Sequence, residues 1–168
     1  MLDAVLNSVI DTLKLEGITA FKQFPERKAD LKSGVFVCVG AESVRGKSSG
    51  MGEYLGIRRG FGGAADTELF GRRLELELGF EIFSPFGAGF GAAACAGCAE
   101  TLRGCIGKFP SGLRALELSC GEILADEELL MFHCRCRLNC TAFLIAESLG
   151  DGAEFLDFIL KGTVKNGY

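Results

Sequence analysis

The sequence predicts an α+β fold in which a mainly antiparallel sheet has one or two helices packed on one face. Residues 72–83 and 130–146 alternate apolar and polar side chains, which is typical of strands with one buried and one solvated face. One helical segment, residues 87–109, separates strands inside the chain, whereas a doubly wound fold needs regular alternation of strands and helices. The 168 residues, 48% of them hydrophobic, suit a single domain spanning the chain. The expected order is α-β-β-(long loop)-β-α-β-β-β.

The first three elements follow from short sequence patterns. Residues 2–15 carry apolar side chains at spacings of three and four, and Gly17 follows as a C-terminal cap, so we expect a helix. Residues 18–24 are β-prone and are closed by Pro25, which predicts a short strand. Residues 34–40 form a continuous apolar run, which predicts a strand inside the sheet and buried on both faces.

A glycine-rich segment follows at residues 43–71, and it shows no sustained period. We expect a long flexible loop here, and a loop of this length in a compact domain is normally functional. Ordering such a loop against a partner permits contact over a large surface. The candidate partner-binding residues are Arg45, Lys47, Met51, Tyr54, Arg58 and Arg59.

The second half of the chain predicts strands at residues 72–83, 113–120, 130–146 and 154–161, because each segment alternates apolar and polar residues. The strand at 130–146 is long enough to need a bend or a bulge. The helix at residues 87–109 is rich in small residues, which allow it to pack close to the sheet.

Charged residues form two rows on the polar faces of these strands. Glu75, Glu77 and Glu81 make an acidic row, and Arg135 and Arg137 make a basic one. If the two strands are neighbours, the rows form cross-strand ion pairs within one chain. If they are not, the rows match between subunits. The sequence leaves both readings open and makes these residues the candidate subunit interface.

Eight cysteines raise the question of a metal or redox site. Cys95-x-x-Cys98 and Cys134-x-Cys136 supply four possible zinc ligands. They fall on the expected buried faces of a helix and a strand, and they lack the tight turns of a zinc ribbon. We therefore interpret them as structural thiols and keep metal binding and redox chemistry as less favoured alternatives.

Other chemistry finds little support. Gly46-Lys47-Ser48 resembles the end of a phosphate-binding loop, but that motif needs a glycine where Ala41 stands and a helix directly after it. His133, the single histidine, has no nucleophile motif to serve. The net charge of −4 does not favour general nucleic-acid binding. We expect no enzyme, no catalytic residue and no cofactor.

Membrane insertion and export are not expected either. Apolar runs of a few residues fall far short of the roughly 20 that a membrane helix needs. The N-terminal residues mix acidic and apolar side chains, unlike a signal peptide. The sequence therefore predicts a protein that stays in the cytoplasm of the cell that makes it.

Three segments resemble small proteins encoded in the tail-gene clusters of bacterial prophages. They are Glu16-Gly-Ile-Thr-Ala-Phe-Lys-Gln-Phe-Pro, Ser49-Gly-Met-Gly-Glu-Tyr-Leu-Gly and Met131-Phe-His-Cys-Arg-Cys-Arg-Leu-Asn-Cys-Thr-Ala-Phe. The α-β-β-β-α-β-β core is similar to that of the tail terminator, or tail completion, proteins of long-tailed bacteriophages.

This resemblance implies a non-enzymatic structural protein that forms a homo-oligomeric ring, usually of six subunits. Such a ring caps the tail tube, stops its polymerisation and prepares head–tail joining. The implied partners are the tail tube protein and the head-completion protein, with DNA passing through the lumen without specific binding. The implied location is the virion after assembly in the host cytoplasm. A head-completion or neck connector protein stays an alternative, because it would share the fold and the ring.

Overall fold

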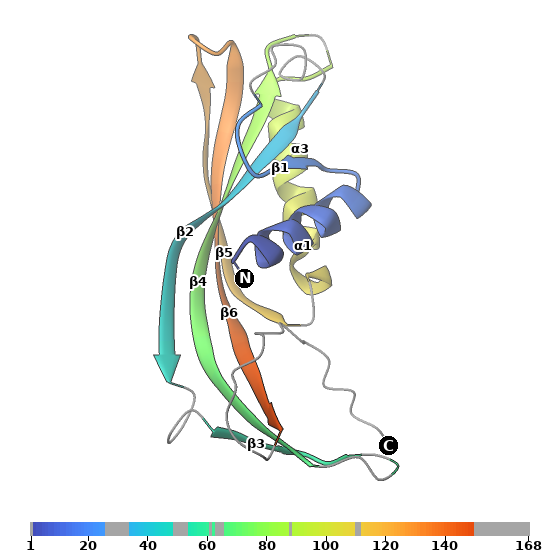
Figure 1. Cartoon of the computed structure of the whole chain (residues 1–168). Coiled ribbons are helices and arrows are strands. Elements are labelled where there is room, and N and C mark those ends of the chain that lie inside the picture. Colours follow the sequence, from blue (N-terminus) through green and yellow to red (C-terminus); the bar gives the residue numbers. More distant parts are fainter. Residues whose placement is uncertain are drawn as a thin grey trace.

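A computed structural model describes residues 2–25, 34–48, 54–60, 62, 66–87, 89–109 and 112–149 of the chain. Within these residues a mixed, mostly antiparallel sheet of six strands carries two α-helices on one side (Figure 1). The α+β class and the mainly antiparallel sheet are therefore confirmed. The elements are α1 (Leu2–Leu15), β1 (Thr19–Phe21), β2 (Phe36–Ser48), β3 (Tyr54–Arg58), β4 (Thr67–Pro85), α3 (Ala92–Gly104), the short 3-10 helix η2 (Ile106–Lys108), β5 (Leu113–Asp126) and β6 (Met131–Leu149).

The strands lie in the order β1-β2-β4-β6-β5, and β3 pairs with β4 beyond the end of β2. β1 runs parallel to β2, while the remaining pairs are antiparallel. The centre is the long β4–β6 pair, which runs in register from Thr67 opposite Leu149 to Pro85 opposite Met131. The alternation that predicted these two strands is confirmed: Leu78, Phe80 and Leu138, for example, are fully buried beneath the helices.

The helix α1 forms over the predicted residues and buries Val5, Val9 and Leu13 against the sheet. Its end is a glycine cap: Gly17 takes a positive φ of 81°, and the Ile18 amide donates to the Leu13 carbonyl at 2.9 Å. The chain thereby reverses into β1, which is shorter than the predicted strand at residues 18–24.

The helix α3 is shorter than the prediction of residues 87–109. Gly87, Gly89 and Gly91 all have positive φ values and lie outside the helix, which begins at Ala92. The buried face consists of Cys95, Ala99 and Leu102. The small side chains on this face lie in the core with β4 and β6, as their size predicted.

The predicted loop at residues 43–71 is wrong for most of its described residues. β2 continues to Ser48, β3 occupies the middle of the segment and β4 begins at Thr67. A bulge between Ala41 and Ser43 shifts the alternation by one residue, so β2 shows no constant period along its length. Pairing with β4, which side-chain pattern does not reveal, holds both β2 and β3 extended. The predicted strand at residues 154–161 lies outside the described residues.

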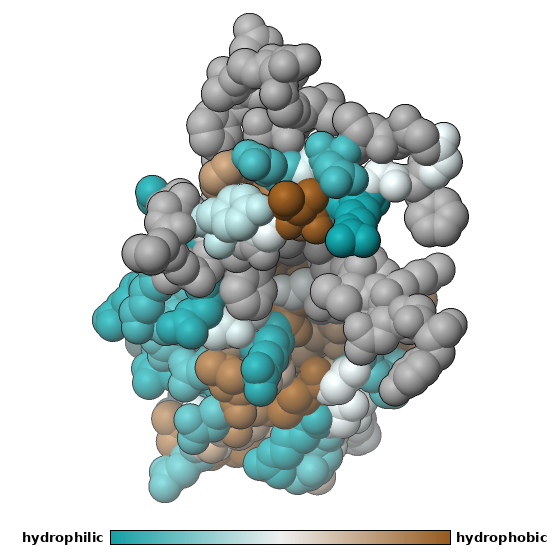
Figure 2. Space-filling model, turned by 90° about the horizontal axis from the view of Figure 1, so that it is seen from below, coloured by the Kyte–Doolittle hydropathy of each residue, from teal (hydrophilic) through white to brown (hydrophobic). Residues whose placement is uncertain are grey.

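The sheet extends well beyond the helices (Figure 1). We call this extension the arm; it comprises residues 44–48 of β2, strand β3, residues 67–73 of β4 and residues 143–149 of β6. No described helix packs on it (Figure 1). Apolar side chains on the arm are exposed, with 45% of Val44, 43% of Tyr54 and 55% of Ile57 accessible. Figure 2 views the molecule from this end and shows apolar surface between hydrophilic side chains.

Candidate functional site

The side of the sheet opposite the helices carries the charged side chains, and we call it the charged face. The register of β4 and β6 sets Glu81 opposite Arg135 and Glu77 opposite Asn139. The acidic and basic rows therefore lie on neighbouring strands of one chain, which is the first of the two arrangements that the sequence left open. The other charged residues of this face are Glu42, Arg45 and Lys47 on β2 and Arg73 on β4.

A residue that the sequence analysis missed joins the two rows. Glu42 lies at the bulge of β2, and its carboxylate accepts hydrogen bonds from Nη2 and Nε of Arg135 at 2.7 and 3.0 Å. Its second oxygen lies 3.1 Å from Nε of Arg137. Both arginines belong to β6, so the Glu42 side chain spans the intervening strand β4.

Gly79 on β4 makes this crossing possible. A Cβ atom built on Gly79 would lie 2.5 Å from Oε1 of Glu42, closer than any side chain tolerates. The sequence does contain a signal for this: Gly79 interrupts the row of glutamates at positions 75, 77 and 81. A glycine inside a strand often marks a site of close approach, here by a carboxylate.

Further pairs involve Glu75 and Glu77 of the acidic row. Glu75 lies 2.9 Å from the Lys47 ammonium and 3.1 Å from the Arg73 guanidinium. The hydrogen bond from Lys47, helped by both positive charges, lowers the pKa of Glu75 below its ordinary value. Glu77 accepts a 3.4 Å hydrogen bond from the Ser43 hydroxyl and lies 3.9 Å from Arg137. The hydrogen bond to Glu42 raises the pKa of Arg135.

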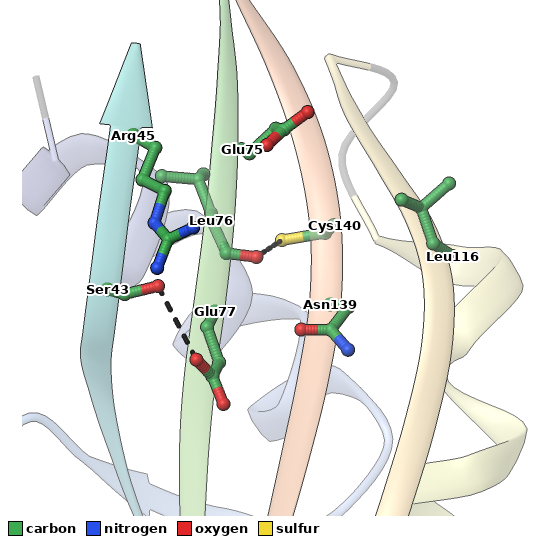
Figure 3. A pocket seen from close by; sticks show the side chains of 8 residues that line it. All are labelled: Ser43, Arg45, Glu75, Leu76, Glu77, Leu116, Asn139 and Cys140. Carbon is green, nitrogen blue, oxygen red and sulfur yellow. Dashed lines mark hydrogen bonds between the residues drawn. The ribbon is translucent and has the colours of Figure 1, made fainter.

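Between these pairs the charged face is hollowed. One hollow of about 270 Å³ lies on the strands β2, β4, β6 and β5 (Figure 3). The helices lie behind the sheet in this view, so the hollow opens away from them. Arg45 borders the hollow on β2 and Leu116 borders it on β5. Its lining is completed by Ser43, Glu75, Leu76, Glu77, Asn139 and Cys140.

Arg45 differs from the other arginines of the charged face. Within the described residues it has no ion pair, although Glu75 is its register partner on β4. Glu75 is instead engaged by Lys47 and Arg73. Arg45 is also exposed, so its guanidinium is available to an acidic group from outside the chain.

A second hollow of about 270 Å³ lies above the glycines Gly40 and Gly79, where β2 and β4 present no side chain. Cys38 lines it, and burial together with the nearby Glu81 raises the pKa of this thiol to about 11. A thiol with this pKa is a poor nucleophile at neutral pH. The ring of His133 stacks on Phe83, with centroids 6.2 Å apart. The charged face thus offers charge and shape for binding, and its thiol is not activated for catalysis.

The four cysteines that the sequence offered as possible zinc ligands lie in or beside the core. Cys95, Cys134 and Cys136 are buried there and Cys98 packs against it. Within the described residues, which include every cysteine, no group of three potential ligands converges as a metal site requires. Burial raises the pKa of Cys95 to about 12 and that of Cys98 to about 11. These thiols pack as small hydrophobic side chains.

The predicted partner-binding residues lie on strands rather than in one loop. Arg45 and Lys47 belong to β2, while Tyr54 and Arg58 begin and end β3. The Tyr54 ring packs edge-on against Phe70 at 5.6 Å. Two further candidates lie nearby in the sequence: Arg59 is exposed directly after β3, and Met51 lies outside the described residues.

Comparison with known proteins adds no relative. No protein-family model matches the chain, and no curated protein matches it significantly. None of the described helices is long and apolar enough to cross a membrane.

Proposed function

We propose that this chain is a structural protein of a long-tailed bacteriophage or prophage, a tail terminator that assembles into a ring on the tail tube. The observation that carries the proposal is the opposite charge of the two lateral edges of one sheet. The resemblance of three sequence segments to prophage tail proteins supplies the biological setting.

One edge is acidic. β5 pairs with β6 and has no further neighbour among the described strands, so it forms a lateral edge of the sheet. Glu117 and Glu122 on β5 are exposed and have no ion pair in the described part of the chain. Glu127 and Glu128 follow in the turn to β6. Although β5 also carries Arg114, negative charge dominates this edge.

The opposite edge is basic. β1 covers β2 over residues 36–38, and from Val39 to the end of β2 the described residues leave that side without a strand. Arg45 and Lys47 lie on this stretch, with Lys47 partly neutralised by Glu75. Positive charge therefore dominates the β2 edge, which meets the acidic edge of a second copy in the proposed ring.

Two different, complementary patches on each copy favour head-to-tail association. Such heterologous contacts close into a ring when the rotation between neighbours divides a full turn. The bulges of β5 at Ala115/Glu117 and Cys120/Ile123 oppose a continuous strand-to-strand ladder. We therefore assign the contact to side-chain charge, with Arg45 meeting Glu117 and Glu122 of the next copy.

The arm supplies a different surface. Its exposed apolar residues Tyr54 and Ile57 lie on β3 together with Arg58, and Arg59 follows directly. An apolar patch with a charged rim suits a protein partner. In the proposed ring this surface meets the tail tube protein, the opposite end meets the head-completion protein, and DNA passes through the lumen without specific binding. The mature location is the head–tail joint of the virion, after assembly in the host cytoplasm.

The test adds the purified protein to tail tube protein while tubes polymerise, and electron microscopy measures tube lengths and end structures. We expect shorter tubes with a ring at one end. Tubes of unchanged length with bare ends would contradict the proposal. A ring that binds the head connector but not the tube would instead assign the chain to the head-completion or neck connector class.

A further inference from the structure

Two cysteine side chains face each other across the strands β5 and β6. The register places Cys120 directly opposite Cys136. Directly opposed residues of antiparallel strands have Cα atoms about 4.5–5.5 Å apart, and a disulfide spans Cα separations of about 4.4–6.8 Å. The sheet therefore holds these two thiols at the separation that a disulfide requires.

The two thiols differ in access. Cys136 is completely buried under the helices, whereas Cys120 is half-buried on the edge strand β5. The bulge that begins after Cys120 breaks the pairing of β5 with β6 until Ile123. A small oxidant therefore reaches Cys120 before it reaches Cys136.

Several other thiols have partners on the backbone. Those of Cys134, Cys140 and Cys105 donate hydrogen bonds to backbone carbonyls, at 3.4, 3.6 and 3.1 Å respectively. The Cys136 thiol instead interacts with Cys120 and Cys134, its thiol neighbours, and burial raises its pKa. Cys134 is the nearest competitor, because it interacts with both Cys136 and Cys120. Cys95 and Cys98 on α3 form a second competing pair.

We propose that Cys120 and Cys136 are a modification site, a cross-strand pair that hydrogen peroxide converts to a disulfide. The Cys120 thiol gives up its proton and the thiolate attacks the peroxide. The O–O bond breaks, Cys120 becomes a sulfenic acid, and the departing hydroxide takes up that proton to form water. The Cys136 sulfur then attacks the Cys120 sulfur, the S–O bond breaks, and the hydroxide leaves with the Cys136 proton as a second water. Two thiols are oxidised by two electrons, and the peroxide is reduced to two waters.

The bond would fasten the edge strand to the strand beside it at the start of a bulge. β5 also carries the acidic edge, but the cross-link does not depend on whether the chain forms a ring. Oxidation should slow the opening of β5, because the cross-link removes the freedom of the two strands to separate.

The test uses the full chain, reduced and folded, treated with hydrogen peroxide and then alkylated in denaturant. Digestion before Asp126 and after Arg135 puts Cys120, Cys134 and Cys136 on three different peptides. We expect mass spectrometry to find the Cys120–Cys136 link, with two fewer alkylated thiols per chain. A link from Cys134 to Cys120 or Cys136, a Cys95–Cys98 link, a link between chains, or sulfinic acid without the Cys120–Cys136 link would overturn the proposal.

Serine variants provide the controls. Cys120→Ser and Cys136→Ser should each abolish the link, while Cys98→Ser should retain it. Cys38→Ser is the matched control for Cys120→Ser, because Cys38 is also half-buried but lies on the charged face. If a core serine impairs folding, hydrogen exchange of β5 in the wild-type chain decides: protection should rise on oxidation and fall again on reduction. Unchanged protection would contradict the cross-link.

Discussion

Glu42 on β2 pairs with Arg135 on β6 at 2.7 Å, although the strand β4 lies between them. Such a contact across an intervening strand depends on a site where that strand carries no side chain, and Gly79 provides it. The pair links β2 to β6 across β4. It also neutralises within one chain the arginines that the sequence made candidates for a contact between chains.

Gly79→Ala should destabilise the fold relative to Gly40→Ala, its register partner on β2. A Cβ on Gly40 meets no atom within 4 Å, whereas a Cβ on Gly79 displaces the Glu42 carboxylate. Replacing a strand glycine by alanine without a clash stabilises by about 0.5–1 kcal/mol. We expect Gly40→Ala to gain this stability and Gly79→Ala not to gain it, as measured by denaturant unfolding. Equal stability of the two variants would show that Glu42 does not depend on Gly79.

Lys47→Met should raise the pKa of Glu75 toward its ordinary value, because the hydrogen bond from Lys47 is the main cause of the lowered pKa. A lowered folded-state pKa stabilises the fold above the unfolded-state pKa, and this contribution is lost as the pH falls through the folded-state value. The variant should therefore lose less stability on acidification than the wild type. NMR titration of the Glu75 carboxyl measures the shift directly. Lys14→Met, on the helix side of the sheet, is the control and should leave that titration unchanged.

Leu138→Ala and Leu116→Ala make a matched pair for the core. Leu138 is fully buried between Leu78 on β4 and Leu118 on β5, whereas Leu116 is 59% exposed. Removing a buried leucine side chain costs about 2–5 kcal/mol, and an exposed substitution changes stability by within about 0.5 kcal/mol. Thermal or denaturant unfolding should separate the two clearly. A large loss for Leu116→Ala would mean that this side chain is covered in solution.

The parts of the fold that the sequence predicted are those whose side chains keep a constant period. Alternation over residues 74–82 and 134–142 predicted which residues of β4 and β6 are buried, and the prediction is confirmed for both strands. The bulge beside Glu42 removed that signal from β2. β3 was missed because pairing with β4, and not a period of its own, keeps it extended.

The candidate site was predicted in its residues but not in its pairings. Alternation placed Glu75, Glu77 and Glu81 on one face, and it did the same for Arg135 and Arg137. Which strands are neighbours depends on long-range pairing, since α3 and β5 separate β4 from β6 in the chain. For that reason the sequence left open whether the rows meet within one chain or between chains.

In the proposed ring, the acidic edge of β5 meets the basic edge of β2 on the next copy. Light scattering after size-exclusion chromatography measures whether copies associate in this way. Glu117→Lys/Glu122→Lys makes both edges basic, and Arg45→Glu makes the β2 edge more acidic; neither change breaks an ion pair in the described part of the chain. We predict that the wild type forms a ring whose fraction rises with concentration, that each variant alone is a monomer, and that mixing the two variants restores the ring. A wild type that stays monomeric at every concentration and on tail tubes, or variants that assemble like it, would contradict this contact between copies.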